Sequence, residues 1–381
     1  MFSFLKKLGF YSTFSRLYDP TTTNREMSSP EIRAQKKQPP SPITSLPEEI
    51  FVDIVARVSR SYYPTLSQVS RRFRSLVASP ELYARRSFLK RTEQCIYVAI
   101  SKDQTSDIHW FTLSDGHRLI HIPSLPPMPL NGSYVAVGSS IFVIGGFQDW
   151  SITASVSLID CRSHTAKALG EMPKAVAGSV TQVIDGKIYV IGGSDGHSPM
   201  KSRSRSMMVF DLETEVWKLK PWPDWEQGKV WFSSVEIGGK IYMRTCYNSF
   251  VYDPLAVTTN NCVGDEVLHS KEWLGACVIE EVLYYYDVRG KCLRGFDPKA
   301  RAWGVVNGLE GLLPRGCSWS KAASYGGGRM VLFMQADEIW CAEIKVERRE
   351  GGEIWGSVEW CDVVLGGNFR IMDCVPVPVL L

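Results

Sequence analysis

Between residues 45 and 90, apolar residues recur every three or four positions, which is the spacing of one face of an α-helix. Ser45-Leu-Pro-Glu48 predicts a helix start: Ser45 can cap the helix, Glu48 can reach back to it, and Pro47 suits the first turn. The apolar residues that follow this start form one stripe at Ile50, Phe51, Ile54, Val55 and Val58.

Two further helices are predicted in the same stretch. Tyr62-Tyr-Pro64 ends the first helix, and the second has an apolar face with three arginines largely off it. That face is made by Leu66, Val69, Phe73, Leu76 and Val77. Ser79-Pro-Glu81 begins a third, short helix that runs through Tyr83. Residues 45–90 are therefore expected to be a small three-helix domain.

After Arg91 the pattern changes to short strands rich in β-branched and aromatic residues, such as Cys95–Ile100 and His109–Leu113. Asp185-Gly186 and Gly238-Gly239 are typical of tight hairpin turns. Residues 92–377 are expected to form a mainly β domain.

This β region repeats. Lys187-Ile-Tyr-Val-Ile-Gly-Gly193 is copied upstream at Ile141–Gly146, and Phe210-Asp-Leu-Glu-Thr-Glu-Val-Trp217 is partly copied at Tyr252–Pro254 and Phe296–Pro298. A strand-rich unit that recurs every 40 to 55 residues indicates a β-propeller. These segments resemble the kelch repeat.

Aligning the units on their second strands predicts six blades. The second strands start near Ile96, Ile141, Ile188, Ile241, Val282 and Met330. The first unit lacks a leading strand, and the apolar tail Phe369–Cys374 is expected to supply it and close the ring. A Gly-Gly doublet directly after the second strand occurs only at Gly145-Gly146 and Gly192-Gly193, which leaves the blade count open.

Residues 1–44 read as a disordered leader and linker rich in Pro and Ser. They carry seven basic and three acidic residues, which is more positive charge than the +3 of the whole chain. The rest of the chain is therefore close to neutral and has no net positive charge to attract nucleic acid. Residues 1–18 weakly resemble an organelle transit segment, and Met27 is a second plausible start. No stretch is apolar enough to span a membrane, and the expected location is the cytoplasm or nucleus.

Enzyme and metal chemistry are not predicted. The ten cysteines include no Cys-x-x-Cys pair, and His117 and His121 are expected in a turn and a strand rather than on one helical face. The sequence has no Gly-x-Ser-x-Gly and no phosphate-binding Gly-x-x-x-x-Gly-Lys segment. We therefore expect a non-catalytic chain without metal or cofactor.

Leu46-Pro-Glu-Glu-Ile50, followed by Val69-Ser-Arg-Arg-Phe73 and Leu76-Val77, resembles the F-box. Together with the repeats, the sequence resembles the plant F-box/kelch-repeat family. That resemblance implies a Skp-type adaptor as partner, a cullin–RING ubiquitin ligase beyond it, and a propeller that binds an unidentified protein substrate.

By this resemblance, the adaptor-docking positions are Leu46, Pro47, Ile50, Ile54, Val69, Phe73 and Leu76. For Ile54 and Phe73 a place in the internal core is the alternative. On the propeller, loops after the second strands and between units are expected to form the substrate face. Its candidate residues are Phe147, Asp149, Trp150, His197, Lys201, Arg203, Arg205, Arg244 and Arg289.

Two alternatives remain open. One is a kelch scaffold that works outside ubiquitin transfer, although the intact Leu46-Pro47 favours the ligase. The other is a propeller whose central channel senses a small molecule, for which the sequence offers no discriminating residue.

The basic segment Lys201-Ser-Arg-Ser-Arg205 yields the first testable prediction. Replacing Lys201, Arg203 and Arg205 with Ser is expected to reduce capture of an acidic or phosphorylated substrate, because the charge-assisted hydrogen bonds are removed, while adaptor binding stays intact. Co-purification of substrate and adaptor with the variant measures both. Unchanged substrate recovery would remove this segment from the site.

Overall fold

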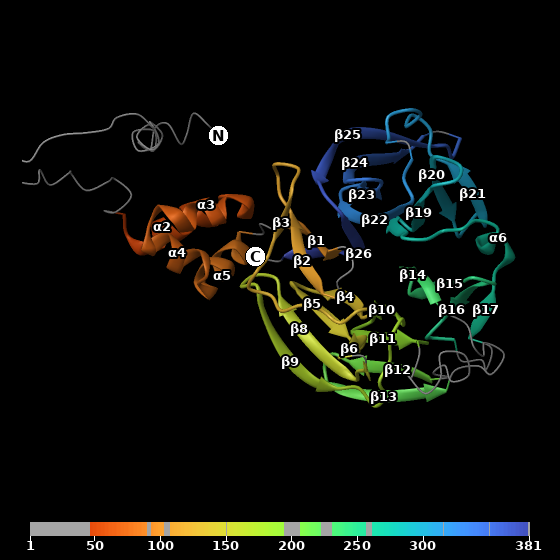
Figure 1. Ribbon diagram of the computed structural model, residues 1–381, viewed down its shortest axis with the longest axis horizontal. Coiled ribbons are helices and arrows are strands. Elements are labelled where there is room, and N and C mark those ends of the chain that lie inside the picture. The colour runs from red at the N-terminus through yellow and green to blue at the C-terminus, as the bar shows by residue number, and fades with distance from the viewer. Residues whose placement is uncertain are drawn as a thin grey trace, which may run out of the picture. The chain divides into compact units, whose positions relative to one another are not determined.

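The computed structural model describes residues 46–89, 93–102, 107–149, 151–193, 206–221, 231–256, 261–314, 316–349 and 351–379. They form two compact units that divide between Arg85 and Arg86, a few residues before the predicted boundary. Helices make up the first unit and strands dominate the second (Figure 1).

The first helix, α2 (Glu48–Ala56), begins later than the predicted cap. Pro47 holds the N-cap position with an extended ψ of 146°, and no side chain caps the helix. Ser45, the predicted cap, lies outside the described residues, and the N-cap position falls on Pro47 instead. The Glu48 carboxylate accepts a hydrogen bond from Arg72 at 2.6 Å.

The predicted second helix is in fact two, α3 (Tyr63–Val69) and α4 (Arg71–Val77), preceded by the 3-10 turn η3 (Arg60–Tyr62). Ser70 separates them because its backbone is extended and its hydroxyl accepts from the Phe73 N–H at 3.3 Å, which caps α4. The last helix, α5 (Pro80–Phe88), is longer than predicted. Together α2 to α4 bury a small core in which the rings of Phe51 and Phe73 meet edge to face at 4.9 Å.

The second unit is a six-bladed propeller of four-stranded antiparallel sheets, as predicted. Blade 1 contains β26 (Phe369–Val379), β1 (Glu93–Lys102), β2 (Ile108–Leu113) and β3 (Leu119–His121); blade 2 contains β4 (Ser133–Val137), β5 (Ser140–Ile144), β8 (Ser155–Asp160) and β9 (Thr165–Glu171); blade 3 contains β10 (Val180–Ile184), β11 (Lys187–Ile191), β12 (Ser206–Asp211) and β13 (Val216–Pro221).

Blade 4 contains β14 (Trp231–Ile237), β15 (Lys240–Thr245), β16 (Ser249–Tyr252) and β17 (Cys262–Gly264); blade 5 contains β18 (Cys277–Ile279), β19 (Val282–Asp287), β20 (Cys292–Asp297) and β21 (Ala302–Val305); blade 6 contains β22 (Trp319–Gly326), β23 (Arg329–Gln335), β24 (Ile339–Arg348) and β25 (Ile354–Leu365). Each predicted second strand is second in its blade. The short α6 (Glu266–His269) follows blade 4, and β6 (Phe147–Gln148) and β7 (Ser151–Ile152) form a hairpin between β5 and β8.

The C-terminal strand completes the first blade, which confirms the prediction. β26 pairs with β1 along its length, from Glu93 opposite Val379 to Lys102 opposite Phe369. Chain segments from the two ends of the propeller unit thus lie side by side (Figure 1).

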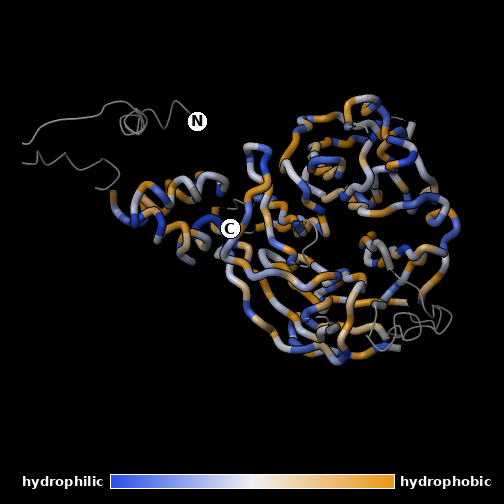
Figure 2. Tube along the Cα trace, viewed as in Figure 1, coloured by the Kyte–Doolittle hydropathy of each residue, from blue (hydrophilic) through white to orange (hydrophobic). Residues whose placement is uncertain are grey.

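Neighbouring blades share their hydrophobic cores. Val180 and Met207 of blade 3 pack in one buried cluster with Ile241 and Phe250 of blade 4, and similar clusters join other adjacent blades. Figure 2 shows hydrophobic stretches along the strands and hydrophilic ones at many turns. Since each blade buries its faces against its neighbours, an isolated blade has no complete core.

The glycine doublet marks a close approach between blades 2 and 3. Gly145 and Gly146 have positive φ, and a Cβ on Gly145 would collide with the carbonyl oxygen of Val176. Gly146 N–H donates to that same oxygen at 2.8 Å. Blade 4 lacks the doublet and closes the turn differently, because the Thr245 hydroxyl accepts from the Asn248 N–H at 3.0 Å.

The aspartates and tryptophans that recur in the repeats have structural contacts. Asp211 Oδ1 accepts from the Thr214 N–H at 3.0 Å, and Asp297 Oδ1 accepts from the Lys299 N–H at 2.9 Å. The Trp303 indole of blade 5 donates to the Val267 carbonyl in α6, the helix that follows blade 4, at 2.9 Å. The repeated residues therefore shape turns and join blades.

Deleting residues 368–381 is expected to unfold the propeller. β26 buries Ile371, Val375, Val377 and Val379, each contributing about 1.5–3 kcal/mol, and together this approaches the whole net stability of a typical domain. Circular dichroism during heating would show loss of the cooperative transition. Deleting only residues 380–381, beyond the strand, is the control. A long truncation that melts like the full chain would contradict closure by β26.

Candidate protein-interaction sites

The helical unit exposes apolar side chains near the start of α2 and the end of α3. Ile50 is 49% exposed and Val69 is 47% exposed, and Pro47 is also exposed. Leu46 and Ile54 are half-buried. Large apolar groups left in water on a small helical unit are typical of a partner-binding surface.

Two of the predicted docking residues lie in the core instead. Phe73 and Leu76 are buried, and Phe73 packs on Phe51. They hold the helices together and can act on a docking surface only through its shape. For Phe73, the structure therefore favours the core alternative over direct contact.

Charged side chains that the sequence analysis overlooked position this surface. Arg72 of α4 lies 4.0 Å above the Phe51 ring, and its guanidinium donates to the Glu48 carboxylate at 2.6 Å and to the Leu46 carbonyl at 3.4 Å. These contacts tie α4 to the segment that carries Leu46 and Pro47. The available signal was Glu48, a carboxylate in the first helical turn.

A second charged cluster braces the opposite end of α2. Asp53 accepts from Arg57 at 3.0 Å and from Arg85 at 2.7 Å. The hydrogen bonds from Arg57 and Arg85 hold the pKa of Asp53 below its usual range. This network connects α2 with α5.

On the propeller, the structure describes four of the candidate residues of the predicted loop face, and three of these are exposed. Phe147 lies in β6 with its side chain exposed, and its backbone pairs with Leu130. Asp149 is exposed at a turn with positive φ. Arg289 is 84% exposed and forms an ion pair with Glu272 at 3.2 Å. Trp150, His197, Lys201, Arg203 and Arg205 lie outside the described residues.

The predicted placement of Arg244 on an exposed loop is wrong. Arg244 lies inside β15 and is only 6% exposed, because its guanidinium is turned beneath the connection from α6 to β18. There it donates to the Lys271 carbonyl at 2.6 Å, to the His269 carbonyl at 3.3 Å and to the His269 ring at 3.2 Å. Its contacts make it a support for that connection.

Three apolar side chains on loops of the same kind were missed. Tyr247 follows β15 and is 69% exposed, and Leu274 and Leu312 lie exposed in connections between blades. Only their positions in the connections between strands distinguish them in the sequence, since apolar residues in a β-rich chain are usually assigned to the core.

The histidines that the structure describes are not gathered into a metal site. His117 stacks on Trp360 at 3.9 Å and contacts Asp362 at 2.7 Å, whereas His164 contacts the Tyr97 hydroxyl at 2.9 Å. Within the described ranges, no three His, Cys, Asp or Glu side chains are placed to share a metal ion. The helices in these ranges are also too short or too polar to cross a membrane.

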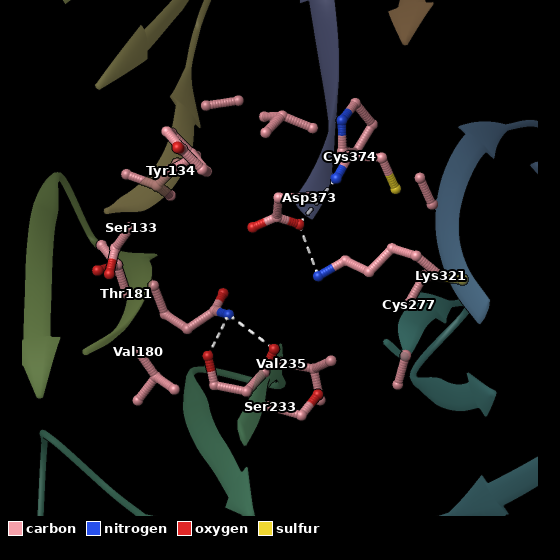
Figure 3. Close-up of a pocket in the computed structure, with 18 of the residues that line it drawn as sticks. Ser133, Tyr134, Val180, Thr181, Ser233, Val235, Cys277, Lys321, Asp373 and Cys374 are labelled. Carbon is pink, nitrogen blue, oxygen red and sulfur yellow. Dashed lines mark hydrogen bonds and ion pairs between the residues drawn. The ribbon is translucent and has the colours of Figure 1, made fainter. Parts of the chain in front are cut away.

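The innermost strands of all six blades surround a central channel with a cavity of about 400 Å³. Figure 3 shows Lys321 and Asp373 facing each other across part of its wall. Tyr134 and Ser133 of blade 2 lie on another side.

Comparison with known proteins matches both units. A family described as "FKB95, Kelch-repeats domain" matches residues 97–365, and the F-box domain matches residues 43–85. The chain is 69% identical to F-box/kelch-repeat protein At4g38940 of Arabidopsis thaliana over 92% of this chain and 100% of that protein. It is 39% identical to putative F-box/kelch-repeat protein At3g10510 of Arabidopsis thaliana, over 90% of this chain and 98% of that one.

The Arg244–His269 contact predicts a pH dependence of stability. Burial, and then the charge of Arg244, lower the pKa of His269 in the folded state, so the unfolded chain binds the proton more readily. Stability is therefore expected to be full above the ordinary histidine pKa and to fall as pH drops below it. Replacing His269 with Gln should flatten this part of the profile, measured by thermal unfolding between pH 7.5 and 5, conditions chosen from the usual histidine pKa of about 6.5. An identical slope in both proteins would contradict the assignment.

Proposed function

Because this chain belongs to the plant F-box/kelch-repeat family, we propose that it is the substrate-recognition subunit of an SCF-type ubiquitin ligase. In this role the F-box docks on a Skp-type adaptor, and the propeller loops bind the protein to be ubiquitinated. The observation that carries the proposal is the apolar surface made by exposed Pro47, Ile50 and Val69 and half-buried Leu46.

Such a subunit contributes to the reaction by positioning the substrate. The chain itself forms and breaks no bond. It raises the effective concentration of substrate lysines near an activated ubiquitin that other subunits carry. A rigid ring of blades suits this task because it fixes its loops on one scaffold.

The substrate face is proposed on the loops after the second strands and between blades. Phe147, Asp149 and Arg289 stay candidates because they are exposed there, and Tyr247, Leu274 and Leu312 join them. Tyrosine and arginine are enriched among the few side chains that dominate binding at protein interfaces. Arg244 is no longer a candidate because it is buried.

Replacing Leu46 and Pro47 with Ala is expected to weaken adaptor binding by roughly tenfold or more, because about 1.5–3 kcal/mol of apolar contact is removed. Titrating purified Skp-type adaptor onto the immobilised full chain measures the affinity.

A second test compares Ile50→Ala with a matched control, Leu219→Ala. Ile50 and Leu219 have side chains of the same size and are both 49% exposed, but Leu219 lies on β13 of the propeller. Ile50→Ala should weaken adaptor binding and Leu219→Ala should leave it unchanged. A folded wild-type chain that does not bind the adaptor would contradict the proposed function.

A further inference from the structure

The central channel has the dimensions of a small-molecule site. Its cavity of about 400 Å³ lies within the range of roughly 300–1,000 Å³ that is common for ligand pockets. Every blade contributes its innermost strand to the wall, so the cavity belongs to the closed propeller and to no single blade.

One side of the wall carries an ion pair with unused hydrogen-bonding positions. Lys321 Nζ lies 2.7 Å from Asp373 Oδ1, and the same oxygen accepts from the Cys374 N–H at 2.8 Å. Within the described part of the chain, no protein group bonds Asp373 Oδ2 or the remaining Nζ hydrogens. The two side chains are 26% and 24% exposed, and Figure 3 shows the second carboxylate oxygen turned away from Lys321.

The facing side offers uncharged polar groups. Gln182 donates its amide hydrogens to the Ser234 carbonyl at 3.0 Å and the Ser234 hydroxyl at 2.9 Å, which fixes the amide and leaves its oxygen as an acceptor. The hydroxyl of Thr181 in the same wall is buried and has no hydrogen-bond partner among the described residues. A buried hydroxyl without a hydrogen-bond partner costs free energy in the folded state. A ligand that shifts this part of the wall could gain a hydrogen bond to the Thr181 hydroxyl.

The charges and thiols of the wall limit the class of ligand. The positive charge of Lys321 is balanced by Asp373, and Glu236 adds a further carboxylate, so a free anion gains no net attraction. Burial raises the pKa of the Cys277 thiol to about 12, which leaves it uncharged and a poor metal ligand. An apolar ligand would strip water from the ion pair without replacing its hydrogen bonds.

A neutral molecule with hydroxyls on adjacent carbons meets these conditions. One hydroxyl can donate to Asp373 Oδ2 while its neighbour accepts from Lys321 Nζ, since the two charged groups lie side by side. We propose that the central channel binds a small neutral polyol, a sugar or another cyclic polyhydroxylated molecule, through Lys321, Asp373 and Gln182. This goes beyond the proposed function and holds whether or not the chain serves a ubiquitin ligase.

Saturation-transfer NMR on the full chain tests the proposal, with D-glucose as the polyol, cyclohexanol as a ring with one hydroxyl, and glucose 6-phosphate as the anion. We expect transfer to D-glucose and roughly tenfold weaker binding of cyclohexanol, the loss expected for one or two hydrogen bonds. These comparisons use the wild-type protein, so they do not depend on the folding of a variant. No transfer to D-glucose, equal binding of cyclohexanol, or binding of glucose 6-phosphate alone would overturn the proposal.

The double variant Lys321→Met with Asp373→Asn tests whether these two side chains bind the polyol. Both charges are removed together, so neither is left buried and unpaired. The matched control is Lys240→Met with Asp253→Asn, which removes an ion pair of 3.1 Å outside the channel. The channel variant should bind D-glucose roughly tenfold more weakly than the control. Equal affinity of the two folded variants would overturn the assignment to Lys321 and Asp373.

Discussion

The pairing of β26 with β1 is the constraint on which the rest of the propeller depends. A ring of sheets is stable only when the first and last blades meet, because every blade buries its faces against its neighbours. Here the last strand supplies the inner edge of blade 1 and brings Asp373 against Lys321 of blade 6. The channel, the shared cores and the fixed position of the loops all require this closure.

The repeats and the binding surfaces use different residues. Asp211, Asp297 and Trp303 recur because each unit must turn and must hold its neighbour. Exposed residues such as Tyr247 and Arg289 have no counterpart set by the repeat. Recognition can therefore vary between relatives while the blades remain the same, since a loop change leaves the shared cores intact.

The architecture was predictable from the sequence because it depends on periodic signals. Strand-rich segments with Gly or Asp-Gly turns located all six second strands, and an apolar tail left without a partner indicated the closing strand. The division at Ser70 was not predictable, because the apolar spacing continues across it and only the hydroxyl cap interrupts the helix. The sequence also did not decide whether Phe73 lies in the internal core or contacts the adaptor, because either role places an apolar residue on the same face of the helix.

The candidate sites were less predictable than the fold. A basic residue at the end of a strand is usually expected to be exposed. Arg244 instead donates to carbonyl groups more than 20 residues away in the chain, and a contact over that separation leaves no pattern in the local sequence. The pairing of Lys321 with Asp373 also joins distant segments, and only the closed ring defines it. Loop residues such as Tyr247 carry no periodic signal at all.

Closure by the last strand also sets an order of events during synthesis. The helical unit precedes the propeller in the chain and is complete when the ribosome has made less than a quarter of the 381 residues. Blade 1, although its other strands are made before the other blades, must wait for β26, the last strand of the propeller in chain order. Nascent chains would therefore display a folded helical unit beside an open array of blades with an unpaired edge at β1, the interval in which co-translational chaperones are most needed.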